Sequence, residues 1–268
     1  MDKKKRIDVL LVEKGFYSTR EKAKRVIMEG VVFVGENRID KPGEKIDIDS
    51  KIIVKKDPIP YVGRGGLKLE KAINSFNIEL RGKTAIDIGA STGGFTDCML
   101  KEGIKKVYAI DVGYGQLDWK LRNDNRVVVK ERTNIRYVKE DDIGERVDFI
   151  SIDVSFISLK LVLPVAESLL KKEGEIVALI KPQFEAGREK VGKKGLVKDK
   201  GVHFEVIKKI LNVCSKNNLQ LDNLTYSPIT GATGNIEFLA HLVKETNLDV
   251  TLSELQIKEI IENAHKRL

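Results

Sequence analysis

TAIDIGASTGGFTD, residues 84–97, is the stretch that decides the fold. Its first five residues form an apolar run of strand length that contains one acid, Asp87, and glycines then mark a tight turn. An apolar pattern at helical spacing begins at Phe95, so the stretch predicts a strand over 84–88, a glycine-rich turn and a helix. Open α/β sheets bind nucleotides at such turns, because glycine lets the backbone approach a ligand and the helix N-terminus offers free N–H groups.

The turn differs from the two common phosphate-binding loops. It has neither the Gly-x-Gly-x-x-Gly spacing of the dinucleotide fingerprint nor the lysine of a Walker loop. An acid just before the turn, Asp87, suits a ligand with a cationic amino group, and Asp111, which ends the next predicted strand, suits a ribose diol. Together these features favour S-adenosylmethionine as the cofactor. An ordinary tight turn followed by a surface acid is the alternative.

Thr133 and Asn134 follow the third predicted strand, where the adenine of such a cofactor could lie. Capping of a turn would suit these two side chains equally well. The residues that we expect to contact the cofactor are Asp87, Gly89, Ser91, Gly93, Gly94, Phe95, Asp111, Thr133 and Asn134.

The composition is that of a globular protein without a disorder signature. The 268 residues are 41% apolar and 33% charged, and this length allows one large domain with a small companion. No apolar run approaches a membrane span, and the apolar stretch behind the basic start is too short for a signal peptide, so we expect a cytoplasmic protein. Two distant cysteines and three isolated histidines indicate neither a disulfide nor a metal site.

The first 60 residues form a basic α+β pattern. They carry 15 Lys and Arg and 11 Asp and Glu, and this surplus of 4 positive charges is half of the formal net charge of +8. Apolar-faced segments over 6–12 and 20–29 predict two helices, closed by Gly15 and Gly30. Short apolar runs predict strands over 31–34 and 52–54. A basic face on a small module fits nucleic acid, although a solvated lysine-rich surface would give the same composition.

The segment RIDVLLVEKGFYSTREKAKRVIMEGVVFVGENRIDKPGEKI resembles an S4-like RNA-binding domain, a small module of ribosomal and RNA-modifying proteins. The resemblance implies that the basic second helix and its flanking turn meet an RNA backbone, in contacts that position the RNA without reading its sequence. A basic surface helix without function is the alternative. The implied RNA-binding residues are Arg6, Arg20, Lys22, Lys24 and Arg25.

A linker and a helix lead to the larger part of the chain. Lys55-Lys-Asp-Pro-Ile-Pro60 is proline-rich and predicts an extended connection. A glycine-rich stretch then opens a helix that ends near Phe76 and has Lys68 in its first turn, where the helix dipole disfavours a cation. A lysine at this place suggests a functional task, although it could simply point to solvent. We expect the S4-like domain over 1–56, the linker over 57–62 and the second domain over 63–268.

From residue 84 onward, predicted strands and helices alternate. This order predicts a parallel, doubly wound sheet with helices on both faces. The predicted helices include 159–170, 203–216 and 253–268. The predicted strands are 84–88, 107–111, 126–130, 147–153, 175–181, 222–228 and 235–243.

Charged residues occupy the ends of three of these strands. Asp153 and Lys181 end their strands, and Glu237 lies at the start of the last one. Carboxyl ends of parallel strands converge on the ligand crevice of such a sheet, where these residues and Lys68 would form a Lys-Asp-Lys-Glu set. Strand-end ion pairs without a catalytic role are the alternative.

The stretches YVGRGGLKL, DIGASTGGFTD, ISIDVSFISL and ALIKPQFEAGREKVGKKGLV resemble FtsJ-like ribose 2′-O-methyltransferases, and with the S4-like segment the chain is similar to the TlyA family of rRNA 2′-O-methyltransferases, also called haemolysins. The resemblance implies a Rossmann-like class I methyltransferase fold, with a mostly parallel seven-stranded sheet and a small α+β N-terminal domain. It implies S-adenosylmethionine as the cofactor, ribosomal RNA or ribosomal subunits as the partner, and cytidine as the target.

The Lys-Asp-Lys-Glu set suits this reaction. A ribose 2′-hydroxyl must lose its proton as it attacks, and a free lysine, with a pKa of about 10.4, is mostly protonated at neutral pH. Burial and the neighbouring Lys68 would favour a neutral Lys181 that acts as the base. Asp153 would orient Lys181 and receive its positive charge, and Glu237 would hold Lys68. The sulfonium donor is already activated, so no metal is required.

A basic segment from Gln183 to Gly201 follows Lys181. We interpret it as a mobile flap over RNA, and a solvated loop is the alternative. Two other functions remain open: a non-catalytic RNA-binding or assembly factor, which the intact set of acids and lysines disfavours, and a membrane-acting haemolysin, which the lack of an apolar span disfavours. Further candidate RNA contacts are Arg64, Arg188, Lys193 and Lys194.

Overall fold

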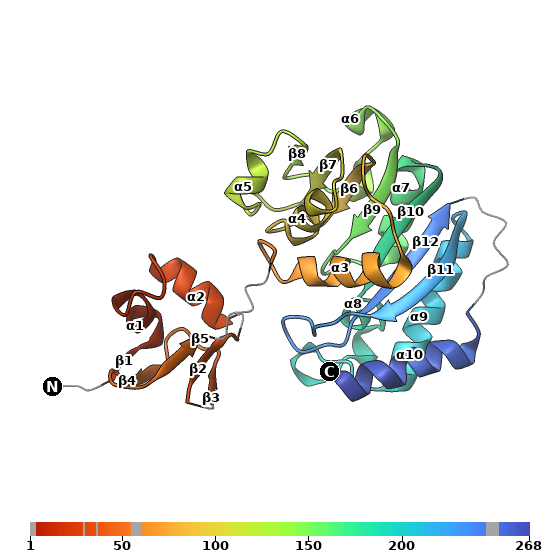
Figure 1. Ribbon diagram of the computed structural model, residues 1–268. Helices are drawn as coiled ribbons and strands as arrows, with labels where there is room; N and C mark the ends of the chain where they lie inside the picture. The colour runs from red at the N-terminus through yellow and green to blue at the C-terminus, as the bar shows by residue number, and fades with distance from the viewer. Residues whose placement is uncertain (1–3, 29, 36, 55–59, 245–251) are drawn as a thin grey trace. The chain divides into compact units, whose positions relative to one another are not determined.

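The chain forms two compact units, residues 1–60 and 61–268 (Figure 1). The computed structural model describes residues 4–28, 30–35, 37–54, 60–244 and 252–268. The division falls within the predicted linker 57–62, of which residues 57–59 lie outside the described residues.

The smaller unit packs two helices against short antiparallel strands. The helices are α1 (Ile7–Glu13) and α2 (Arg20–Met28), as the apolar periodicity predicts, and Gly15 follows α1 with a φ of +74°. One sheet has β2 (Val32–Val34) between β3 (Asn37–Ile39) and β5 (Ile52–Val54), and β1 (Lys4–Arg6) pairs with β4 (Lys45–Asp47). Strands β1, β3 and β4 were not predicted, because each has only three residues and most of them are polar. The core of the unit includes Ile7, Leu10, Leu11, Ala23, Ile27 and Val32.

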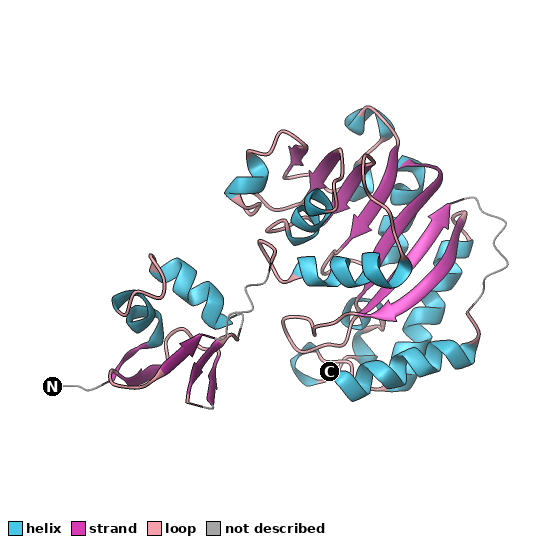
Figure 2. Ribbon diagram, in the orientation of Figure 1, coloured by secondary structure: helices cyan, strands magenta, loops and turns pink. Residues whose placement is uncertain are grey.

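The larger unit is built on a seven-stranded sheet in the order β11-β12-β10-β9-β6-β7-β8. Figure 2 shows the strands of the protein in magenta. Strands β6 to β10 are parallel, whereas β12 pairs antiparallel with both β10 and β11, so the predicted mostly parallel sheet is confirmed. The strands are β6 (Thr84–Ile88), β7 (Lys106–Ile110), β8 (Val127–Lys130), β9 (Val147–Ile152), β10 (Leu170–Ile180), β11 (Leu219–Tyr226) and β12 (Phe238–Lys244).

Helices cover both faces of this sheet (Figure 1). Alternate residues of a strand point to opposite faces, and β12 follows this rule: Phe238, Ala240 and Leu242 join a core with α9, while His241 stacks on Phe76 of α3. The helices are α3 (Gly65–Phe76), α4 (Gly94–Lys101), α5 (Trp119–Arg122), α6 (Glu140–Ile143), α7 (Leu159–Leu169), α8 (Pro182–Glu185), α9 (Lys200–Ser215) and α10 (Glu254–Arg267).

Some boundaries differ from the predicted ones for local reasons. Helix α9 begins three residues before the predicted start, because Asp199 caps it by accepting a hydrogen bond of 3.1 Å from the backbone N–H of Val202. Strand β12 begins three residues after the predicted start, because Gly231 N–H donates to the carbonyl oxygen of Asn235 and closes a turn before the strand.

The segment 183–201 is not the continuous loop that was predicted. It contains most of α8 and two 3₁₀ turns, η2 (Arg188–Lys190) and η3 (Lys193–Gly195). It is also tied to the fold, since Val197 N–H donates to Asn235 Oδ1 at 2.9 Å and the Glu185 carboxylate accepts hydrogen bonds from Ser158 and Leu159.

Candidate active site

The turn after β6 lies where the order of the parallel strands reverses, between β7 and β9. The backbone N–H groups of Gly89 and Ala90 both donate to the carbonyl oxygen of Ile110, at 2.9 and 3.1 Å, and tie the end of β6 to the end of β7. Gly89 has a φ of +84°, and a Cβ there would overlap the carbonyl oxygen of Asp153, which follows β9. The turn therefore brings the ends of three strands together, as the ligand crevice of an open α/β sheet requires.

Asp87 is fully buried beneath this turn. It lines neither of the two cavities near the turn, which are described below. Its carboxylate accepts hydrogen bonds from Thr96 Oγ1 at 2.6 Å and Ser151 Oγ at 3.0 Å, and burial raises the pKa of Asp87 to about 6. The position does not support the predicted contact with an amino group of the ligand. The side chain points to the face of the sheet that α4 covers, where its hydrogen bonds with Thr96 and Ser151 stabilise the structure beneath the turn.

Gly93 and Gly94 are both crowded by neighbouring parts of the protein. Gly93 has a φ of +94°, and a Cβ there would overlap Leu121 and meet Leu117 at 2.8 Å. A Cβ on Gly94 would lie 2.9 Å from the backbone nitrogen of Gly66 in α3. Gly93 therefore lets the leucines pack, and Gly94 lets α3 and α4 meet. Gly94 also lines the smaller of the two cavities at the site, so its contact with a ligand stays a prediction.

A cavity of about 690 Å³ opens at the ends of β6, β7 and β9. Asp111 lies in its wall, fixed by hydrogen bonds that its carboxylate accepts from the N–H groups of Ser91, at 2.8 Å, and Gly113, at 2.6 Å. Thr133 and Asn134 also line it. The Asn134 side chain in addition accepts a hydrogen bond of 3.2 Å from Arg136 N–H at the start of η1 (Ile135–Tyr137), so it caps this turn as the alternative predicted.

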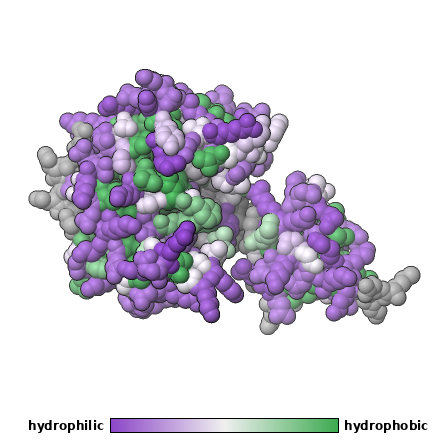
Figure 3. Space-filling view, turned by 180° about the vertical axis from the view of Figure 1, so that it is seen from behind, coloured by the Kyte–Doolittle hydropathy of each residue, from purple (hydrophilic) through white to green (hydrophobic). Residues whose placement is uncertain are grey.

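Large apolar side chains stand around this cavity in contact with solvent. Val112, Phe156 and Leu161 line it, and Phe156 is 90% exposed. From behind, hydrophobic residues gather on one area of the larger unit, whereas the smaller unit is mainly hydrophilic (Figure 3). The larger cavity is therefore lined by both polar and apolar residues, and some of the apolar ones are exposed to solvent.

A second cavity of about 230 Å³ adjoins the first. Gly89, Ser91, Asp153 and Ser155 line both cavities, so the two share a wall. The smaller one reaches from the glycine turn, including Gly94 and Phe95, to Lys181. A ligand held near Asp111 can therefore extend toward Lys181.

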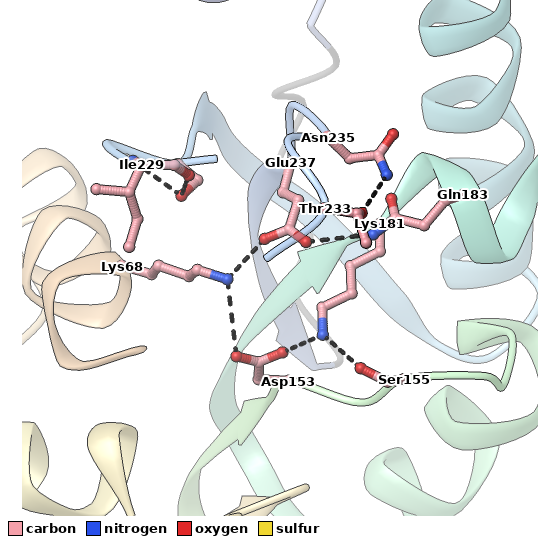
Figure 4. Close-up of polar contacts among 10 residues, drawn as sticks. Lys68, Asp153, Ser155, Lys181, Gln183, Ile229, Thr233, Asn235 and Glu237 are labelled. Atoms are coloured by element: carbon pink, nitrogen blue, oxygen red, sulfur yellow. Dashed lines mark hydrogen bonds and ion pairs between the residues drawn. The ribbon is translucent and has the colours of Figure 1, made fainter. Parts of the chain in front are cut away.

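The four predicted catalytic residues lie together (Figure 4), and two of them, Asp153 and Lys181, line the smaller cavity. Lys68 Nζ lies 2.6 Å from Glu237 Oε2 and 4.0 Å from Asp153 Oδ2, and Asp153 Oδ1 lies 2.6 Å from Lys181 Nζ. Positive and negative charges thus alternate in the order Glu237, Lys68, Asp153, Lys181. This alternation is what keeps four largely buried charges acceptable, because each one has an opposite neighbour.

Local sequence explains these positions. Pro182 follows Lys181 and holds it in an extended conformation at the end of β10, with a φ of −109°. Gly231 leaves the room that the Glu237 carboxylate occupies, since a Cβ there would lie 3.1 Å from Glu237 Cδ. Lys68 is in the first turn of α3, the helix that the glycines let approach the site.

Two polar contacts of the set were not predicted. Ser155 Oγ accepts a hydrogen bond of 2.9 Å from Lys181 Nζ, and Gln183 Nε2 donates a hydrogen bond of 3.4 Å to Glu237 Oε1. Both residues stand two positions after a predicted catalytic residue, Asp153 and Lys181 respectively. That proximity is the one signal that could have found them.

The candidate RNA-binding residues fall into two groups. In the smaller unit, Arg6 and Arg20 both pair with the buried Asp8 carboxylate at 2.9 Å, and the Arg6 hydrogen bond lowers the pKa of Asp8 to about 2. Lys22 and Arg25 are exposed on α2 and Lys24 is half-buried. In the larger unit, Arg64 precedes α3, while Arg188, Lys193 and Lys194 are exposed in η2 and η3.

The described residues offer neither a metal cluster nor a membrane helix. No three His, Cys, Asp or Glu side chains among them lie together as metal ligands would. None of the helices in the described ranges combines the length and apolar character needed to cross a bilayer.

The doubly wound sheet, the glycine turn and the adjoining cavities at its switch point define the class of protein: a Rossmann-like enzyme domain that binds a nucleoside cofactor, preceded by a small basic module. A family model described as FtsJ-like methyltransferase matches residues 61–244, and one described as S4 domain matches residues 5–52. The chain belongs to the TlyA family, in which an S4 domain precedes an FtsJ-like methyltransferase domain.

Individual relatives support this assignment. The chain is 55% identical to the Bacillus subtilis protein named "Putative rRNA methyltransferase YqxC", over 99% of this chain and 96% of the relative. It is 37% identical to the 16S/23S rRNA (cytidine-2′-O)-methyltransferase TlyA of Mycobacterium tuberculosis, over 98% of both chains. A solved structure titled "Putative hemolysin from Streptococcus thermophilus" is 48% identical, with a TM-score of 0.79 over 100% of this chain and 98% of that one.

Proposed function

We propose that this protein transfers the methyl group of S-adenosylmethionine to the 2′-hydroxyl of a cytidine in ribosomal RNA. The observation that carries the proposal is the alternating set of Glu237, Lys68, Asp153 and Lys181 at the end of a cavity that begins at the glycine turn. Two relatives with rRNA methyltransferase in their names support the substrate, and the name of the Mycobacterium tuberculosis relative supports cytidine.

The residues of the two cavities fit the cofactor. The fixed Asp111 carboxylate keeps acceptor capacity for the two hydroxyls of a ribose, and the neighbouring Ile110 and Ile135 offer apolar surface to a base. The backbone of Gly89, Ser91 and Gly94, together with Phe95, would hold the amino-acid end in the smaller cavity. When bound, the cofactor supplies an electrophilic methyl group.

The chain's own residues handle the proton. Lys181, as a neutral amine, takes the proton of the 2′-hydroxyl while the oxygen attacks. Asp153, 2.6 Å from Lys181 Nζ, stabilises the ammonium that forms. Glu237 and Lys68 complete the alternation of charges, and Lys68, whose Nζ lies 4.0 Å from Asp153 Oδ2, helps to hold the Asp153 carboxylate in place. Positioning of the hydroxyl in line with the methyl group would provide much of the remaining acceleration.

The RNA partner is recognised through several surfaces in this proposal. The basic residues of the S4 domain neutralise backbone phosphates, and the exposed Phe156 beside the larger cavity offers a ring on which an unpaired base can stack. Ribosomal RNA or an assembled ribosomal subunit would be the partner, and the cytoplasm the place of the reaction.

Mapping of 2′-O-methyl groups in ribosomal RNA tests the function. Cells without the gene should lack one or more cytidine 2′-O-methyl groups, which the wild-type gene restores and the Lys181→Ala gene does not. Identical maps with and without the gene would overturn the proposal. Methylation assays of the purified protein with isolated ribosomal subunits and with protein-free ribosomal RNA would show which of the two is the substrate.

A further inference from the structure

Ser155 occupies a fixed place beside Lys181. The segment from Asp153 to Leu159 and the segment from Lys181 to Glu185 are joined at three levels. Asp153 meets Lys181 at one end, the rings of Phe156 and Phe184 lie 4.9 Å apart, and Ser158 Oγ donates to Glu185 Oε2 at 2.6 Å at the other end. Ser155 lies within the first of these two segments, which is anchored at both ends, and its hydroxyl is next to the Lys181 side chain.

The two oxygens next to Lys181 Nζ do different work. Asp153 Oδ1 lies 2.6 Å away as an ion pair, yet this oxygen has no partner with hydrogen-bond geometry among the described residues. Ser155 Oγ, at 2.9 Å, accepts a hydrogen bond from Nζ (Figure 4). Asp153 therefore supplies charge, while Ser155 supplies direction.

Direction matters because a base must aim its lone pair. A neutral lysine has two N–H bonds and one lone pair, and a hydrogen bond to one acceptor restricts rotation about the Cε–Nζ bond. Lys181 and Ser155 both line the smaller cavity, whereas the Lys181 side chain is only 10% exposed. An N–H directed at Ser155 leaves the lone pair free to face this cavity.

We propose that Ser155 is a positioning residue for methyl transfer, whose hydroxyl holds one N–H of Lys181 and so aims the amine at the ribose 2′-hydroxyl. The inference rests on the proposed function. In the step itself, the 2′-O–H bond would break and its proton would form the third N–H bond of Lys181. The oxygen's electron pair would form the bond to the methyl carbon as the bond from this carbon to the cofactor sulfur breaks, and the electron pair of that bond would stay on sulfur as a neutral thioether. Ser155 changes no bond.

Removal of the hydroxyl should affect the chemical step alone. The rate of single-turnover methylation, with both substrates saturating, should fall about fivefold in Ser155→Ala, since one neutral hydrogen bond contributes about 1 kcal/mol. The affinity for S-adenosylmethionine, measured by calorimetry, and for RNA should stay within twofold. Ser155→Thr keeps the hydroxyl and should recover most of the rate. Ser168→Ala is the matched control, because Ser168 donates to the carbonyl of Val165 on the exposed side of α7.

The dependence of the rate on pH separates positioning from general damage. Ser155 stabilises the ammonium form more than the neutral form, because hydrogen bonds from charged donors are stronger. In Ser155→Ala, the pH at which the methylation rate reaches half of its maximum on the acidic side should therefore be lower than in wild type. The maximum rate should also be lower. A Ser155→Ala rate within twofold of wild type, an unchanged pH of half-maximal rate, or a substrate-binding Ser155→Thr as slow as Ser155→Ala would overturn the inference. If the wild-type protein methylates no ribosomal RNA, the proposed function fails instead.

Discussion

Lys68 Nζ donates a hydrogen bond of 2.6 Å to Glu237 Oε2, although 169 positions separate the two residues. The contact joins α3, which precedes the sheet, to the residue that leads into β12. Both side chains are withdrawn from solvent, with 10% and 2% exposed, so each charge depends on the other. The pair therefore links the stability of the larger unit to its candidate active site.

Breaking this pair should destabilise the fold. Lys68→Met leaves the Glu237 carboxylate buried without its main partner and should lower the free energy of unfolding by about 3–5 kcal/mol. The double variant Lys68→Met/Glu237→Gln removes both charges and should regain at least half of that loss, while methylation stays absent. Urea denaturation measures both effects. Losses that simply add would show that the two residues do not depend on each other.

Substitution of Lys181 should distinguish a base from a fixed charge. Lys181→Ala should lower the single-turnover rate by ~10²–10⁴-fold while S-adenosylmethionine and RNA still bind. Lys181→Arg should be nearly as slow, because arginine keeps its proton. An arginine variant within a few-fold of wild type would leave Lys181 with an electrostatic role only.

Asp87 should give the stability of the protein a pH dependence. Its pKa is raised from 3.8 to about 6 in the folded state, so the folded protein holds this proton more tightly than the unfolded chain does. The stability from Asp87 is fully present below about pH 4 and is lost as the pH rises through 6. Relative to Asp87→Asn, wild type should lose about 2–3 kcal/mol between pH 4 and pH 7. Parallel curves of unfolding free energy against pH would contradict this.

Gly93→Ala should destabilise the protein without any ligand. Gly82 is the matched control, because both glycines have a positive φ, of +94° and +74°, but no atom lies within 4 Å of where a Cβ on Gly82 would stand. Gly93→Ala should cost about 1–3 kcal/mol more than Gly82→Ala, since only its methyl group meets Leu117 and Leu121. Thermal unfolding measures the difference. Equal losses of stability would mean that packing at Gly93 is loose and would favour a role of Gly93 in close approach of the ligand.

Loss of the S4 domain should weaken RNA binding in a salt-dependent way. A protein without residues 1–60 should keep its affinity for S-adenosylmethionine, because the residues of both cavities lie within 61–268. Its affinity for ribosomal RNA should fall less steeply with salt than that of the full chain, since fewer phosphates are neutralised. Equal salt slopes in filter-binding measurements would exclude α2 from the RNA interface.

Sequence reasoning succeeded where long apolar runs carried the signal. The strands that end near Asp87, Asp153 and Lys181 are buried, so their composition is distinctive, and their parallel order follows from the intervening helices. Because the carboxyl ends of parallel strands share one edge, the positions of Asp153 and Lys181 in the sequence were enough to predict that they meet.

The remaining features depend on information that a linear pattern lacks. Alternation along β6 decides that Asp87 points under α4, and no spacing rule shows which face of the sheet the ligand uses. The crowding at Gly93 and Gly94 comes from α3 and from Leu121, which packing alone brings there. The Ser155 contact depends on a turn in which Phe156 adopts a φ of +63°, a conformation that its sequence does not announce.

The place of β12 has a consequence for the newly made protein. This strand is the last of the sheet to be synthesised, yet it lies between β10 and β11, so β11 reaches the sheet only through it. Glu237 stands at its entrance and reaches Lys68 only when the strand is seated. A nascent chain in which β12 has not yet left the ribosome therefore lacks the contact between the Glu237 carboxylate and Lys68. In the proposed mechanism, the candidate site is therefore complete only after β12 has joined the sheet.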